Sequence, residues 1–118
     1  CSTPMVAASR NLPRKKVMQM LLMGEMVDAE TAADWGLINR AVDDGTALDE
    51  AMAIAAAIAE KSPATVKIGK EAFYNQLDMP LEDAYRYTTQ VMVDNMMHRD
   101  AEEGINAFIE KRAPTWQG

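Results

Sequence analysis

Residues 99–116 read RDAEEGINAFIEKRAPTW, and this run predicts a helix with a defined start and a defined end. Asp100 and Glu103 have the spacing of a capping box, in which side chains satisfy the free backbone N–H groups of the first helical turn. Pro114 cannot continue a helix, because it lacks a backbone N–H. We therefore expect a helix over residues 99–112.

The same run predicts a functional face on this helix. At about 100° per residue, Ile105, Phe108, Ile109 and Arg112 share one face, and Lys111 lies about 60° of arc from Phe108. The spacing thus predicts an aromatic ring beside two cations, Lys111 and Arg112.

Composition indicates an ordinary globular chain. Its length of 118 residues is the size of one domain. Its composition, 48% hydrophobic and 25% charged, argues against disorder. The sequence contains no stretch of about 18 apolar residues that could span a membrane, and no signal peptide is visible. The single cysteine, Cys1, excludes an internal disulfide and suits a reducing compartment, so we expect a cytoplasmic protein, or a mitochondrial-matrix protein if the source is eukaryotic.

Charge argues against nucleic acid as a partner. Twelve Lys and Arg residues against 18 Asp and Glu residues give a formal net charge of −6, which would repel a polyphosphate. A small anion could still bind where cations gather locally.

Helix start and stop signals recur along the chain and predict a mainly α fold of about six helices with one short strand. Asp28 and Ser62 are N-cap residues, Pro63 suits a first helical position, and Gly24 and Gly36 are left-handed stops. The predicted helices cover about 11–24, 28–35, 47–60, 62–76, 81–97 and 99–112. The run Leu37-Ile38-Asn39-Arg40-Ala41-Val42 predicts the strand, which would need a pairing partner from elsewhere.

The sequence offers no assembled catalytic chemistry, so we predict no catalytic residue and no metal ligand in this chain. His98 is the only histidine, and no nucleophile is paired with it by spacing. No Cys/His set has metal-ligand spacing. Most adjacent carboxylates, such as Asp49-Glu50 and Glu82-Asp83, sit where the helix dipole favours negative charge.

Two separated segments carry a family resemblance. Residues 24–42, GEMVDAETAADWGLINRAV, and the 99–116 run closely resemble the C-terminal part of the crotonase superfamily, the enoyl-CoA hydratases and isomerases. Ser62-Pro63, followed by Lys67 and Lys70, also falls where that family has a Ser-Pro-led helix with lysines.

This resemblance implies an enzymatic function whose catalytic residues lie outside this chain. In the family, an oxyanion hole and acidic residues upstream stabilise and protonate a thioester enolate, so the chain alone would be inactive. It implies that residues 1–45 end the spiral core and that residues 46–118 form the helical trimerisation subdomain of an α/β crotonase fold. It also implies that Phe108 and Lys111 border the coenzyme A site.

The partners and cofactors implied by the resemblance are few. They are an acyl-CoA substrate in the full-length protein and further copies of the chain, in a trimer or a dimer of trimers. Coenzyme A would enter as part of the substrate, and no separate cofactor is expected. The parent would be a lyase or isomerase of fatty acid metabolism.

Two other interpretations stay open at this point. The chain could be a self-contained helical module that binds other proteins without ligand chemistry. It could also be a small acidic helical regulator, although that hypothesis leaves the family spacing of Phe108 and Lys111 unexplained.

Overall fold

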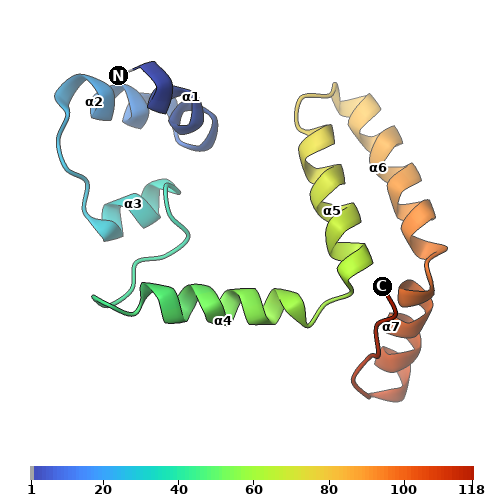
Figure 1. Cartoon of the computed structure of the whole chain (residues 1–118). Helices are drawn as coiled ribbons and strands as arrows, with labels where there is room; N and C mark the ends of the chain where they lie inside the picture. The colour runs from blue at the N-terminus through green and yellow to red at the C-terminus, as the bar shows by residue number, and fades with distance from the viewer. Residues whose placement is uncertain (1) are drawn as a thin grey trace. The chain divides into compact units, whose positions relative to one another are not determined.

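A computed structural model of the chain describes residues 2–118, which form seven helices and no strand (Figure 1). The mainly α fold class is confirmed. The helices are α1 (Ser2–Asn11), α2 (Arg14–Met23), α3 (Ala29–Trp35), α4 (Ala47–Ala59), α5 (Pro63–Gln76), α6 (Leu81–Met96) and α7 (Arg99–Glu110).

The chain divides into two compact units, which we describe separately. The first unit ends at Ala51, and the second unit is Met52–Gly118. Helices α1 to α3 belong to the first unit, and α5 to α7 belong to the second.

In the first unit, α1 contacts α2, and Leu12 and Val17 are buried near the start of α2. Helix α2 ends where predicted, because Gly24 takes a left-handed φ of 65° and its N–H donates to the Met20 carbonyl. Helix α3 begins at the predicted cap, where Asp28 Oδ1 accepts the Thr31 N–H at 2.7 Å.

Helix α1 is an element that the sequence patterns do not predict. Pro4 lies in its first turn, where the missing N–H costs little. Two polar side chains bond back along the helix: Arg10 Nη1 donates to the Val6 carbonyl at 3.1 Å, and Asn11 Nδ2 donates to the Ala7 carbonyl at 2.8 Å. Both bonds lie in the second half of the helix.

The strand predicted for residues 37–42 is not formed within the described part of the chain, and this expectation was wrong. The N–H groups of Leu37 and Ile38 both donate to the Ala32 carbonyl, at 2.8 and 3.4 Å, and so complete the end of α3. Backbone donors used in this way cannot join a ladder, and no second strand is present among residues 2–118 to pair with the rest.

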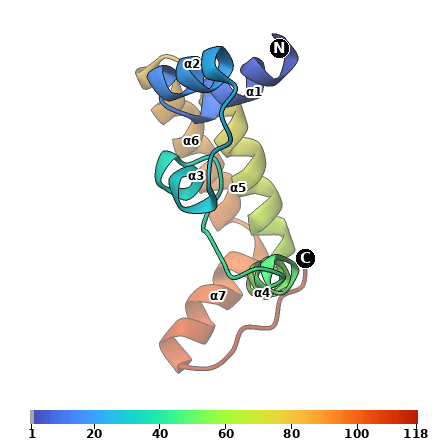
Figure 2. The same cartoon turned by 90° about the vertical axis from the view of Figure 1, so that its left-hand side faces the viewer.

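In the second unit, α5 and α6 run antiparallel and side by side (Figure 1 and Figure 2). Small buried residues, Ala72 on α5 and Ala84 on α6, allow a close approach. Asn75 Nδ2 donates to the Tyr87 hydroxyl across the pair at 3.0 Å. Helix α7 packs on both α5 and α6 and buries Ala107.

Few large apolar side chains are covered within residues 2–118. The buried apolar residues are Leu12, Val17 and four alanines, whereas Met26 is 97% exposed. Exposed apolar residues also lie on the second unit, including Ile54, Ile58 and Met92. No helix in residues 2–118 combines the length and the apolar character that crossing a membrane requires.

Candidate functional site

The predicted capping box at the start of α7 is wrong, because Asp100 serves a different contact. His98 occupies the N-cap position without a side-chain cap bond. Asp100 is 3% exposed as a residue, and its carboxylate accepts the Ser62 hydroxyl at 2.5 Å and the Gln117 N–H at 2.8 Å. The Ser62 hydroxyl, and then the Gln117 N–H, hold the pKa of Asp100 below its usual value. Asp100 therefore joins α7, the start of α5 and the C-terminal tail.

Glu103, the second member of the predicted box, also binds the tail. Arg112 Nη1 and Nη2 reach Glu103 Oε1 and Oε2 at 2.6 and 2.9 Å, and Oε1 also accepts the Thr115 N–H at 2.7 Å. The bidentate Arg112 bond, followed by the Thr115 N–H, lowers the pKa of Glu103 to about 2. Glu103 and Glu110 together raise the pKa of Arg112.

A third contact completes this arrangement. Trp116 Nε1 donates to the Glu60 carbonyl at 2.7 Å, and the Trp116 ring lies over Gly104. We call residues 111–118 and the groups that hold them, Glu60, Ser62, Asp100 and Glu103, the C-terminal clasp. Figure 1 shows the C-terminus returned to the start of α5.

The clasp changes the predicted arrangement of Phe108 and its neighbouring cations. Helix α7 ends at Glu110, not at Arg112, because Lys111 takes the left-handed conformation with φ 55° and ψ 38°. Arg112 turns back to Glu103, so the prediction of two cations beside Phe108 on one helical face is wrong for Arg112. Phe108 is 85% exposed and precedes Lys111 by three residues. Their coenzyme A contact stays a prediction.

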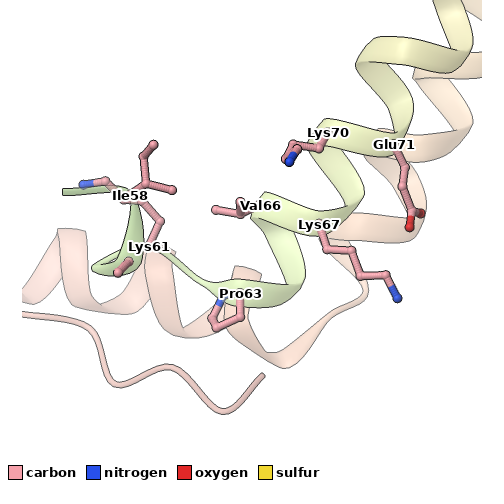
Figure 3. A pocket seen from close by; sticks show the side chains of 8 residues that line it. Ile58, Lys61, Pro63, Val66, Lys67, Lys70 and Glu71 are labelled. Atoms are coloured by element: carbon pink, nitrogen blue, oxygen red, sulfur yellow. The ribbon is translucent and has the colours of Figure 1, made fainter. Parts of the chain in front are cut away.

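A separate groove lies between the end of α4 and the first half of α5, with a volume of about 650 Å³ (Figure 3). Ile58, Pro63 and Val66 give it apolar walls. Figure 3 shows Lys70 on the side of α5 toward Ile58, whereas Lys67 points away from it. The full lining is Ile58, Ala59, Lys61, Pro63, Val66, Lys67, Lys70 and Glu71.

Our sequence reasoning missed the groove as a site. Lys67 and Lys70 are three residues apart on a helix that starts at Ser62-Pro63, and this spacing places them on adjacent turns, although their side chains extend in different directions. No sequence pattern predicts the groove that forms at the connection between α4 and α5. Apolar walls beside lysines suit a molecule with an apolar part and an anionic group.

His98 and the adjacent carboxylates considered in the sequence lie outside the clasp and the groove. His98 is exposed. Asp49-Glu50 and Glu82-Asp83 lie in the first turns of α4 and α6, as expected from the helix dipole, and both Glu82 and Asp83 pair with Arg86. Within residues 2–118, no group of three His, Cys, Asp or Glu residues is placed to hold a metal ion.

Comparison with known proteins identifies relatives along the whole described chain. Residues 2–118 match the enoyl-CoA hydratase/isomerase family. The human mitochondrial enoyl-CoA hydratase domain-containing protein 3 is 46% identical over 116 residues, which are 98% of this chain and 38% of that protein. A carnitinyl-CoA dehydratase of Escherichia coli is 36% identical over 91% of this chain and 42% of its own length.

Solved structures agree with these relatives. The crystal structure of the human enoyl-CoA hydratase domain-containing protein 3 superposes with a TM-score of 0.94 at 46% identity, over 98% of this chain and 46% of that one. An enoyl-CoA hydratase of Mycobacterium smegmatis also has a TM-score of 0.94, at 44% identity, and its structure is matched over 46% of its length. The chain thus spans less than half of these relatives.

The identities also confirm a finer resemblance in the sequence. Residues 1–4, 69–77 and 92–95 resemble the enoyl-CoA hydratase domain-containing protein 3 group, which is the group of the human relative. Together with the match over residues 2–118 and the shared helical arrangement, these findings show that the chain belongs to the enoyl-CoA hydratase/isomerase family, the crotonase superfamily.

Proposed function

We propose that this chain is the C-terminal helical part of a longer protein that acts on acyl-CoA thioesters. In this proposal it packs subunits together and forms one wall of the coenzyme A site, while the oxyanion hole and the acidic groups lie upstream. Coenzyme A is part of the substrate, and no further cofactor is needed. The proposal keeps the boundary near residue 45 between the end of the spiral core and the trimerisation subdomain.

The observation that carries the proposal is the exposure of Phe108, three residues before Lys111. The Phe108 ring is 85% exposed at the end of α7, so residues 2–118 leave it open to a ligand. The ring offers an apolar face to pantetheine or adenine, and the Lys111 ammonium offers a point charge to phosphate. Family membership supports a coenzyme A thioester as the ligand that combines these groups.

Exposed apolar side chains support the packing role. Ile54, Ile58 and Met92 are uncovered on the second unit, and contiguous exposed apolar surface marks interaction sites. We propose a trimer, or a dimer of trimers, as the assembly. The proposed compartment is the cytoplasm, or the mitochondrial matrix in a eukaryote, and the human relative is named as mitochondrial.

Truncation of Lys111 tests the proposed site. In the complete gene product that contains this chain, Lys111→Ala should weaken coenzyme A binding by about 1–3 kcal/mol, the range for a hydrogen bond to a charged group. The melting temperature should change little, because the Lys111 ammonium takes part in none of the ion pairs within residues 2–118. Calorimetric titration measures the affinity.

Lys15→Ala is the matched control, since Lys15 is an exposed lysine on α2 in the first unit. It should leave the affinity unchanged. Equal coenzyme A affinities for Lys111→Ala and the unaltered protein would defeat the assignment, and equal losses in both variants would reduce it to a general charge effect.

A further inference from the structure

Lys111 has an unusual backbone conformation for its residue type. It is the one non-glycine residue among residues 2–118 with a positive φ, at 55°. The left-handed position after a helix is usually glycine, because a Cβ there is crowded by the backbone. The surrounding structure must therefore hold Lys111 in a conformation that its own sequence disfavours.

The Lys111 and Arg112 N–H groups close this turn by donating to the Ala107 carbonyl, and Glu103 adds a side-chain restraint to it. Its two carboxylate oxygens bind Arg112, the residue next to Lys111, and Oε1 also binds the Thr115 N–H. Bidentate pairing fixes the direction of Arg112 as well as its distance. One side chain on α7 thus restrains the backbone immediately after Lys111 and again four residues beyond it.

The restraint leaves the Lys111 side chain free for another partner. Arg112 takes up both nearby carboxylates, Glu103 and Glu110, whereas the Lys111 ammonium takes part in none of the ion pairs of the described residues. Phe108, three residues earlier, exposes its ring on the same end of α7. Arg112 is therefore paired with carboxylates, whereas Lys111 is available to a ligand.

We propose that Glu103 is a positioning residue that, through Arg112 and the Thr115 N–H, holds Lys111 where its ammonium meets the phosphate of a phosphate-bearing thiol ester. This inference rests on the proposed function and assigns to Glu103 a role that acts only through Lys111.

A double-mutant cycle on the complete gene product, titrated with free coenzyme A, tests the inference. Glu103→Gln retains the size of the side chain but loses the charge that binds Arg112 bidentately. It should weaken coenzyme A binding at least about twofold, as expected for coupling within one ion-pair network. In the Lys111→Ala background, the same change should have no further effect.

Glu110→Gln is the matched control, because Glu110 binds Arg112 through Nε only and does not bind the tail. It should leave affinity near that of the unaltered protein. If Glu103→Gln fails to fold, as judged by circular dichroism, Arg112→Lys replaces it, since lysine keeps the charge without the bidentate geometry.

The outcomes separate the two proposals. Unchanged affinity in Lys111→Ala defeats the proposed coenzyme A site itself. A loss in Lys111→Ala without a loss in Glu103→Gln overturns only the positioning role, and so does a Glu103→Gln loss of equal size in both backgrounds.

Discussion

Gly104 shows how closely the tail packs on α7. A Cβ built at Gly104 would lie 3.4 Å from Cη2 and 3.5 Å from Cζ3 of Trp116, which is contact distance. Gly104 also lies within α7, where glycine is a poor helix former. The space beside Gly104 therefore suits a methyl group and nothing larger.

This geometry predicts opposite effects for two substitutions. Gly104→Ala should raise stability by up to about 1 kcal/mol, because alanine has the higher helix propensity. Gly104→Val should lower the melting temperature, because its extra carbons would displace the Trp116 ring. Thermal unfolding followed by circular dichroism gives both values.

Gly69 on α5 provides the control, since nothing lies within 4 Å of a Cβ built there. Gly69→Val should be tolerated at least as well as glycine. If valine is equally harmless at both positions, Trp116 does not pack on Gly104 in solution.

At the scale of the element, α7 is held by carboxylates whose charge depends on pH. The pKa of Glu103 falls from its usual 4.5 to about 2 on folding, so its stabilising contribution is fully present above about pH 4.5. That contribution is lost as pH falls through the folded pKa near 2. The pKa of Asp100 is shifted in the same direction.

We therefore expect the clasp to loosen between pH 4.5 and 2. Trp116 fluorescence in a Trp35→Phe background reports the transition, because Trp35 and Trp116 are the two tryptophans. In Glu103→Gln, the part of the pH dependence that belongs to this carboxylate should disappear. A variant whose acid transition matches that of the parent would show that Glu103 makes no pH-dependent contribution.

Sequence reasoning succeeded where an element is set by its own residues. The caps at Asp28 and Ser62 and the stops at Gly24 and Gly36 act within about four residues, and all four are confirmed. It failed where the contact of a side chain depends on a partner that is distant in the sequence.

Asp100 and Glu103 have capping-box spacing, yet Asp100 bonds Ser62, 38 residues away, and Glu103 bonds Thr115, 12 residues away. No periodicity in the sequence reveals such partners. The exposure of Phe108 could not be predicted either, because neighbouring Ile105 and Ile109 gave it the pattern of a core residue.

At the scale of the molecule, residues 2–118 leave many more large apolar side chains exposed than buried. Ile54, Ile58 and Met92 are all uncovered on the second unit. Such surface finds partners when it forms patches above a few hundred Å². Light scattering of the 118-residue chain should therefore show self-association that increases with concentration.

Met92→Lys should weaken this association, because it places a charge on the uncovered face of α6, and it should leave the helical circular dichroism signal unchanged. Lys15→Ala serves as the control on a polar surface. A monodisperse monomer at high concentration would contradict the packing role.

The bond from Trp116 Nε1 to the Glu60 carbonyl closes a loop of 56 residues. Closing so long a loop costs chain entropy, and this cost is smaller once α5, α6 and α7 have formed and the free chain between the two groups is short. We therefore expect the clasp to form after α5, α6 and α7 and to open before them. Since the Thr115 and Gln117 amides donate to side-chain carboxylates rather than to helix carbonyls, their hydrogen exchange would time the opening of the tail separately from the unwinding of α7.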